Sequence, residues 1–338
     1  MIRCDIRNPS ATDLVSALFS GDAPSLWSDP AVIPAHSGKA ALNHVLSYLR
    51  SIRVLENKNS KILTPPWMGY WVYNAMRPHG FPSLHADPDV KVAIVYHQYG
   101  FPQNLDEIKN ECSRRKMIFI EDCAHALDGT YEGRPLGTEG LAGIFSLSKF
   151  YPSLIGGAVR SSDSALRAHV ARLGNEGSRA LGLFSFGVKL AVMRSSSGGR
   201  ESSVARRLNE LAYAAYPYSR RLGWSGRLCT LARIRGEMAS RRENYALYRR
   251  LLPSHDELQA LEADAVPYVV PLMHPRREAL EKIAAALRES GLDTGIYSFD
   301  AGRNIFNARY VPCVWLPVHG GITAERVENI VGIVKGLL

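Results

Sequence analysis

The sequence predicts an α/β protein whose large domain has a mostly parallel central sheet and whose C-terminal domain is smaller and α+β. Apolar strand-like runs alternate with helical patterns between residues 35 and 160, which is typical of parallel strands joined by crossover helices. Beyond residue 159 this rhythm changes, and helices outweigh short strands. A chain of 338 residues can form two such domains, and we expect them at 1–220 and 221–338.

The elements of the large domain follow in order. Residues 1–33 are a poorly patterned lead-in broken by prolines. Ser37 is the expected N-cap of a helix whose apolar stripe runs from Ala40 to Leu49. Next come a strand at 61–64, a helix at 67–76, a buried strand at 92–96, a helix at 105–115 and a strand at 117–120. Since parallel sheets bind ligands beyond the carboxyl ends of their strands, Asp122 stands where a site is expected.

The second half is predicted to be largely helical. Residues 180–193 are apolar but too short to span a bilayer, and we favour a core helix over an interfacial segment. The Ser- and Gly-rich residues 195–203 predict a loop. The remaining elements are a helix at 231–252, a strand at 266–272, a helix at 275–290 and a last helix capped by Thr323.

Composition points to an ordinary globular protein, with 46% hydrophobic and 22% charged residues. The first residues lack the apolar run of a secretion signal, so we expect the cytoplasm. Five scattered cysteines without a Cys-x-x-Cys spacing support neither a disulfide framework nor a metal site.

The net charge of +9 is concentrated in one region. Residues 176–250 contain 15 Lys or Arg against 5 Asp or Glu, and 176–220 is an atypical basic insert. Such a region attracts a phosphate-rich substrate, an acidic partner or an anionic membrane surface, although a solvated helical face explains it equally well. Nucleic acid is not expected because no binding motif accompanies the charge, and peripheral membrane contact is a less favoured alternative.

The pattern with most chemical meaning lies between residues 120 and 159. Asp122 ends an apolar strand, and Lys149 follows between two further apolar strands with Ser146 and Ser148 beside it. A pyridoxal 5'-phosphate enzyme needs an acid for the pyridine nitrogen, a lysine for the Schiff base, and hydroxyls and amides for the phosphate. The alternatives are an acid that caps a loop and a solvated surface lysine.

Five segments resemble, in order, the DegT/DnrJ/EryC1/StrS family of sugar aminotransferases, which have the aspartate aminotransferase fold (fold type I). They are Ser-Gly-Lys-Ala-Ala-Leu at 37–42, His-Gln-Tyr-Gly-Phe-Pro at 97–102, Glu-Asp-Cys-Ala-His-Ala at 121–126, Tyr-Glu-Gly-Arg-Pro-Leu-Gly at 131–137 and Leu-Pro-Val-His-Gly-Gly-Ile-Thr at 316–323. The family's Asn-Tyr-Arg segment, which reaches into the partner subunit's site, is missing around residues 224–227, and 177–220 has no counterpart.

The resemblance implies a role for each site residue. Lys149 would form the Schiff base, Asp122 would pair with the pyridine nitrogen, and His125 would touch the ring hydroxyl. The residues implied for the phosphate are Ser146 and Ser148 near the lysine, and Gly38 and Lys39 at a helix N-terminus. Where the family has its ring-stacking aromatic this chain has Gly69, and Trp67, Tyr70 or Trp71 would cover the ring face instead.

The resemblance also implies the activity. It is transfer of an amino group from an amino acid, expected to be glutamate, to a keto-sugar, for example a nucleotide-linked one, in natural-product or polysaccharide biosynthesis. Pyridoxamine phosphate would link the two half-reactions, and the protein would be a homodimer. One alternative is another reaction of the same cofactor, such as sugar dehydration, although the dehydratases we compare replace the lysine. The other is a non-catalytic binding or regulatory relative.

Overall fold

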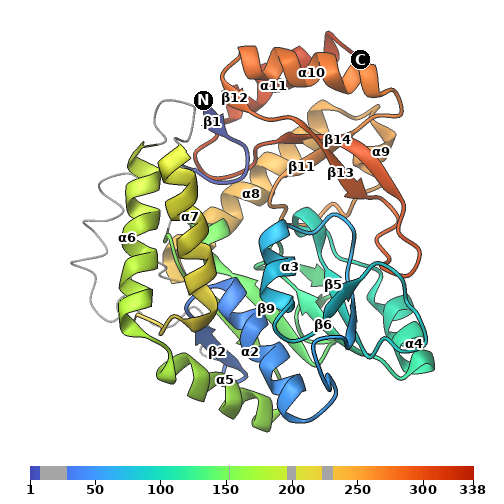
Figure 1. Ribbon diagram of the computed structural model, residues 1–338. Coiled ribbons are helices and arrows are strands. Elements are labelled where there is room, and N and C mark those ends of the chain that lie inside the picture. Colours follow the sequence, from blue (N-terminus) through green and yellow to red (C-terminus); the bar gives the residue numbers. More distant parts are fainter. Residues whose placement is uncertain (8–28, 152, 196–202, 223–230) are drawn as a thin grey trace.

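A seven-stranded sheet forms the centre of the larger part of the computed structural model, which describes residues 1–7, 29–151, 153–195, 203–222 and 231–338 (Figure 1). The strand order is β2-β10-β9-β6-β5-β3-β4. Strand β10 is antiparallel to both neighbours and every other pair is parallel. The bounds are β2 Val32–Ala35, β3 Lys61–Leu63, β4 Phe81–Ser83, β5 Val92–Tyr96, β6 Ile118–Asp122, β9 Ala142–Ser146 and β10 Gly157–Arg160. The mostly parallel sheet predicted from the sequence is confirmed.

Of the four helices of this part, two begin where the sequence patterns predict, one begins at Tyr70 instead of residue 67, and the helix at 164–176 was not predicted. They are α2 Gly38–Ser51, α3 Tyr70–Met76, α4 Leu105–Arg115 and α5 Ser164–Glu176. Ser37 caps α2, since its Oγ accepts a hydrogen bond from the Ala40 N–H. The apolar stripe of α2 packs against one face of the sheet and fixes the position of its N-terminus.

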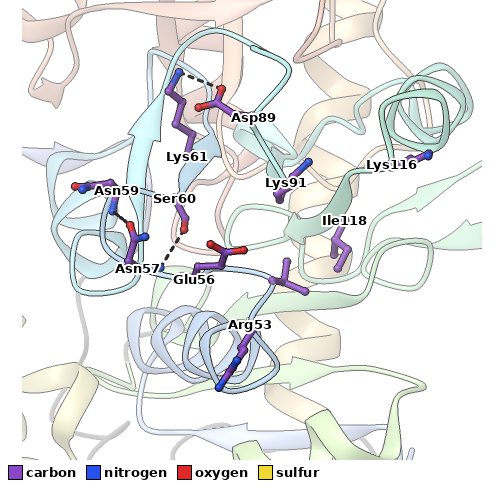
Figure 2. Close-up of a pocket in the computed structure, with 11 residues that line it drawn as sticks. Arg53, Glu56, Asn57, Asn59, Ser60, Lys61, Asp89, Lys91, Lys116 and Ile118 are labelled. Atoms are coloured by element: carbon purple, nitrogen blue, oxygen red, sulfur yellow. Dashed lines mark hydrogen bonds and ion pairs between the residues drawn. The ribbon is translucent and has the colours of Figure 1, made fainter.

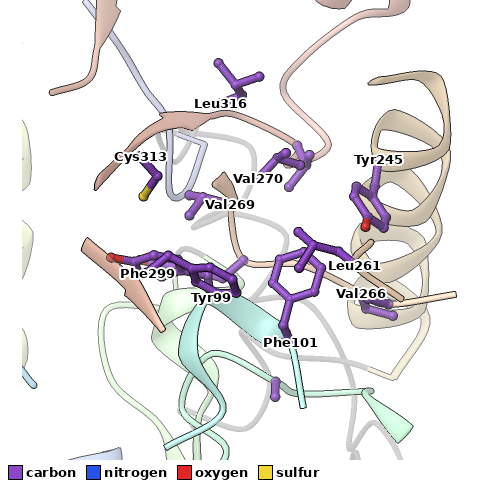
Figure 3. Packing of buried hydrophobic residues seen from close by; sticks show 14 of the residues in the cluster. Tyr99, Phe101, Tyr245, Leu261, Val266, Val269, Val270, Phe299, Cys313 and Leu316 are labelled. Atoms are coloured by element: carbon purple, nitrogen blue, oxygen red, sulfur yellow. The ribbon is translucent and has the colours of Figure 1, made fainter. Parts of the chain in front are cut away.

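A second core joins the sheet to the C-terminal part. After β5, the short 3-10 helix η1 Gln98–Gly100 carries Tyr99 into this core. Figure 3 shows Tyr99 and Phe101 meeting Phe299 and Tyr245 from the C-terminal elements. The ring of Tyr99 stacks on Phe299 at 5.8 Å between centroids, and Phe101 meets Tyr245 edge-on at 5.7 Å. These contacts extend the core continuously into the C-terminal part.

The C-terminal part is α+β, as predicted. Strands β11 Val270–Met273, β14 Tyr310–Leu316 and β13 Ile296–Asp300 form an antiparallel sheet in that order. The helices are α8 Leu231–Leu251, α9 Asp256–Gln259, α10 Arg277–Glu289 and α11 Ala324–Lys335. Thr323 caps α11 through a hydrogen bond to the Arg326 N–H, as expected.

The first residues of the chain lie beside this C-terminal part. Strand β1 Ile2–Arg3 pairs in parallel with β12 Leu292–Asp293. A two-residue strand has no period, which is why the lead-in reads as unpatterned. The boundary between residues 220 and 221 stays a prediction, and β1 shows that the start of the chain contacts the C-terminal part.

The basic insert folds as a pair of helices at one flank of the sheet, drawn in green and yellow in Figure 1. Helix α6 Arg179–Ser195 packs along α7 Ser203–Ala215, and the 3-10 turn η4 Tyr216–Tyr218 follows. The predicted helix at 180–193 is confirmed, but only one of its sides is covered: Ser185 and Val188 are buried while Leu183 and Phe184 are exposed. Most of the predicted loop, 196–202, lies outside the described residues. No helix among the described residues is long and apolar enough to cross a membrane.

Candidate active site

Asp122 and Lys149 both lie at the carboxyl edge of the parallel strands. Asp122 ends β6, and the neighbouring parallel strand β9 runs directly into the 3-10 turn η2 Leu147–Lys149. Burial raises the pKa of Asp122, and the charge of Lys149 opposes that rise. Burial lowers the pKa of Lys149, against the charges of Asp122 and Asp5. The two groups predicted to be catalytic therefore lie within electrostatic reach of each other.

His125 fixes the amine of Lys149. Its Nε2 lies 2.8 Å from Lys149 Nζ, and its Nδ1 lies 2.6 Å from the Tyr96 hydroxyl. Burial, with the charges of Lys149 and Arg241, holds the pKa of His125 well below its usual value, so the ring is neutral. A neutral imidazole donates at one nitrogen and accepts at the other, so it links the amine to the phenol in either tautomer.

Two residues that the sequence did not single out complete this region. The ring of Tyr268 stacks on His125 at 4.0 Å between centroids. Its hydroxyl donates to Asp5 Oδ2 at 2.9 Å, and Arg3 donates to the same carboxylate at 2.6 Å. The predicted strand at 266–272 contained Tyr268, but no sequence signal marks Asp5, which acts through a contact 263 residues away.

The N-terminus of α2 and Ser146 form a second, polar end of the site. An ideal Cβ built on Gly38 would lie 2.9 Å from the Cβ of Ser146, so only a glycine allows this approach. The first amides of a helix have no partner within it, and they attract anions together with the helix dipole. Gly38 and Ser146 thus lie together, as the motif implies.

Lys39, the next residue of the motif, lies under the helices of the insert. Its Nζ lies 3.2 Å from the ring centroid of Tyr213 on α7. Burial and the charges of Lys189 and Lys149 lower the pKa of Lys39 to about 6. The structure therefore brings Lys39 within electrostatic reach of Lys149.

The remaining predicted residues have different positions. Ser148 is half-buried next to Lys149 in the chain. Trp67 and Tyr70 are 57% and 67% exposed; the ring of Trp67 lies near Tyr310 and that of Tyr70 against Trp71. The ring of Tyr268 stacks on His125, which contacts Lys149. Stacking by Trp67 or Tyr70 on a cofactor stays a prediction.

Two other polar places do not share this chemistry. A hollow of about 480 Å³ lies at the opposite edge of the sheet, before β3, β5 and β6, and its Lys61 is ion-paired with Asp89 (Figure 2). His97, Glu121 and Cys123 are close enough to hold a metal ion. However, the Glu121 carboxylate already accepts hydrogen bonds from His97 and from three backbone amides of residues 137–140.

The donor set fits the cofactor that the sequence implies. The Asp122 carboxylate and the Lys149 amine lie at the same edge of the sheet. The close packing of Gly38 on Ser146 places the Ser146 hydroxyl beside the first amides of α2. Pyridoxal phosphate requires this combination of acid, amine and anion site.

A model of the DegT/DnrJ/EryC1/StrS aminotransferase family matches residues 86–335. The chain belongs to this family. The matched residues include Asp122, His125, Ser146 and Lys149, whereas α2 lies before them.

Individual relatives match over shorter stretches. The L-glutamine:2-deoxy-scyllo-inosose aminotransferase of Streptomyces kanamyceticus is 35% identical over 92 residues, 27% of this chain and 22% of that protein. The L-glutamine:scyllo-inosose aminotransferase of Streptomyces griseus is 40% identical over 82 residues, 23% of this chain and 19% of that protein. The chain thus matches about a fifth of the length of these family members.

The similarity to solved structures extends over the whole chain. The sugar aminotransferase CalS13 from Micromonospora echinospora superposes with a TM-score of 0.64 at 20% identity, covering 99% of this chain and 100% of that one. At this identity the similarity concerns the fold, and the predicted fold type I architecture is confirmed.

Proposed function

We propose that this family member is a pyridoxal phosphate-dependent aminotransferase that moves an amino group from an amino acid to a keto-sugar or a similar cyclic ketone. The observation that supports this most is the environment of Lys149. Burial lowers the pKa of its amine, and the charge of Asp122 opposes this shift. The amine is also hydrogen-bonded to His125, whose ring is neutral. Such an environment is typical of a reactive lysine.

The chain's own groups have distinct roles in this proposal. When bound, pyridoxal phosphate supplies a ring that stabilises negative charge on the donor's α-carbon. Lys149 Nζ would accept the proton from that carbon, because a lowered pKa leaves more of the amine neutral. Asp122 would maintain a proton on the ring nitrogen through its charge. His125 would orient the amine through the 2.8 Å contact.

The proposed substrates rest on the similarity to the inosose aminotransferases and on the basic residues of the chain. We propose glutamate or its amide as donor, since the two inosose aminotransferases are named for L-glutamine. The acceptor would be a keto-sugar or a ring ketone of the inosose kind, and the basic residues would receive a phosphate group if the sugar carries one. Homodimeric assembly and a cytoplasmic location belong to the same proposal.

The test is the absorbance spectrum of the purified protein with added pyridoxal phosphate, before and after borohydride. Lys149→Ala is compared with Lys282→Ala, an exposed lysine on α10. We expect a visible band in the wild type and in Lys282→Ala but not in Lys149→Ala. Borohydride should abolish this band by reducing the C=N bond, which leaves the cofactor attached to Lys149, where peptide mass locates it. Amino donors are then ranked by loss of the band, glutamate and glutamine first.

Other outcomes would point to the alternatives. Loss of water from a keto-sugar without gain of an amino group would favour a dehydratase. Absence of a band in the wild type would remove Lys149 from its proposed role and favour a non-catalytic relative.

A further inference from the structure

The buried ring of His125 has two hydrogen-bond partners, one at each nitrogen. Its Nδ1 lies 2.6 Å from the hydroxyl of Tyr96 at the end of β5, and its Nε2 lies 2.8 Å from the amine of Lys149 in η2. In the part of the chain that the structure describes, His125 is the one hydrogen-bond partner of both groups. A neutral imidazole carries a single N–H, so the nitrogen that holds the proton decides what each partner must do.

Two aromatic neighbours fix the plane of the His125 ring. The ring of Tyr268 lies 4.0 Å away between centroids with 16° between the planes, and that of Tyr99 lies 6.1 Å away with 25°. Tyr268 is held in turn by the hydrogen bond from its hydroxyl to Asp5. The His125 ring is therefore nearly parallel to both neighbours, and its nitrogens keep their directions toward their partners.

The phenol of Tyr96 distinguishes the two tautomers of His125. If the phenol donates to Nδ1, the ring proton is on Nε2, and both the O–H and the N–H point at a partner. In the other tautomer Nδ1 donates to the phenol oxygen, which leaves the O–H of Tyr96 without an acceptor among the described residues. The separation of 2.6 Å also suits an O–H donor better than an N–H donor, whose bonds are usually longer. Burial raises the pKa of Tyr96 well above its usual value, so the phenol keeps the proton that it donates.

We infer that Tyr96 is a positioning residue that acts through His125: its hydroxyl donates to Nδ1, keeps the ring proton on Nε2 and directs this N–H at the amine of Lys149. An ammonium group has only donors, so only the uncharged amine can accept this hydrogen bond. The pair of Tyr96 and His125 therefore favours the uncharged form of Lys149, and the charge of Asp122 opposes it. The inference deepens the proposed function and rests on it for the use of the amine, since only the uncharged form attacks a carbonyl or accepts a proton.

Other ionisable groups surround this pair and stay in place in the test. They are Asp122 at the end of β6, Asp5 after β1, Lys39 of α2, Arg241 of α8 and Tyr310 of β14, besides Tyr99 and Tyr268. Replacement of a tyrosine by phenylalanine removes one hydroxyl and no charge. A change in the titration of Lys149 in such a variant therefore reports a hydrogen bond and not the net charge of the site.

The first experiment determines the tautomer of His125 in the cofactor-free protein by nitrogen NMR of isotope-labelled histidine rings. The signals of His125 are assigned by their loss in His125→Leu. Near neutral pH we expect a proton on Nε2 and none on Nδ1 in the wild type, and a proton at least partly on Nδ1 in Tyr96→Phe. Tyr99→Phe is the matched control, because the Tyr99 hydroxyl donates to the Ser298 carbonyl and should leave the tautomer as in the wild type. A proton on Nδ1 in the wild type overturns the inference.

The second experiment follows Lys149 itself by competitive acetylation over a range of pH. Tyr96→Phe should raise the labelling midpoint of Lys149 by about 0.5–1 pH unit, because a hydrogen bond that favours the uncharged amine is lost. Tyr99→Phe should not move it. Because Tyr96 acts through His125, Tyr96→Phe should cause no further change when it is added to His125→Leu. An unmoved midpoint in Tyr96→Phe, or an equal change with and without His125, contradicts the inference.

Neither readout needs the cofactor, so the inference and the proposed function fail separately. If the wild type forms no absorbance band with pyridoxal phosphate but Tyr96→Phe still raises the midpoint of Lys149, the proposed function is wrong and the role of Tyr96 stands. If the band forms and Tyr96→Phe changes neither the tautomer nor the midpoint, the proposed function stands and the role of Tyr96 is refuted.

Discussion

Lys149 and Asp122 carry opposite charges in a place where burial disfavours both. The charge of Asp122 opposes the burial that lowers the pKa of Lys149. We expect Asp122→Asn to lower the pKa of Lys149 further, because the group that stabilises its ammonium form is gone. Competitive acetylation of the cofactor-free protein over a range of pH, read by mass spectrometry, measures this. The exposed Asp89→Asn is the control, and an unmoved labelling midpoint in Asp122→Asn would contradict the coupling.

Lys39 makes the stability of the cofactor-free protein depend on pH. Its pKa is about 6 in the folded chain against 10.5 for the ordinary group, so the unfolded chain binds more protons between these values. The free energy of unfolding therefore rises with pH across that window. Below its lower end Lys39 is charged in both states, and the destabilisation has its full size.

Lys39→Met should remove this pH dependence and raise the melting temperature near neutral pH by roughly 1–4 °C. The expected rise is small because Lys39 is only partly buried and solvent screens its charge. Calorimetric melting at several pH values tests it, with the exposed Lys282→Met as control. A lower melting temperature for Lys39→Met at neutral pH would show that the charge is not destabilising.

At the scale of elements, α2 depends on its first residue. An alanine at Gly38 would be favoured by helix propensity, but its Cβ would clash with Ser146 at 2.9 Å. We expect Gly38→Ala to lose about 1–3 kcal/mol of unfolding free energy and to bind phosphate-bearing ligands less well. Gly332→Ala in α11, where a Cβ meets nothing within 4 Å, should instead gain about 0.5–1 kcal/mol. Urea unfolding measures the free energy of unfolding of both variants. It shows whether the Cβ clash or the helix propensity of alanine dominates at Gly38.

Sequence patterns predicted most of the long elements, although not the helices α5 and α7. The stripe of α2, the buried strand β5 and the end of β6 are local features, so Ser37, Asp122 and Lys149 could be placed from them. Short elements such as β1, β4 and β12 carry too few residues for a period. Tyr268 was missed for another reason: its contact with Asp5 joins segments far apart in the chain, and no local pattern encodes such a contact.

At the scale of the whole molecule, Arg241 ties three segments together behind the site. This fully buried residue of α8 is ion-paired with Glu237 at 2.7 Å and donates to the carbonyls of Asp5, Pro267 and Tyr268. Arg241→Met should cost about 3–5 kcal/mol, because it leaves a buried carboxylate and several carbonyls unpaired. Its neighbour Arg242 forms an exposed ion pair, and Arg242→Met should cost at most about 1 kcal/mol. Denaturant titration compares the two, and similar losses would contradict the assigned role of Arg241.

The pairing of β1 with β12 has a consequence for the order of events during synthesis. Ile2 and Arg3 leave the ribosome about 290 residues before their partners Leu292 and Asp293. At about 5–20 residues per second, this strand waits roughly 15–60 seconds for its neighbour. The parallel sheet can form in that time, but Asp5 cannot reach Tyr268 until residue 268 has emerged. A nascent chain therefore contains Lys149 and His125 before the contact between Asp5 and Tyr268 can form beside them.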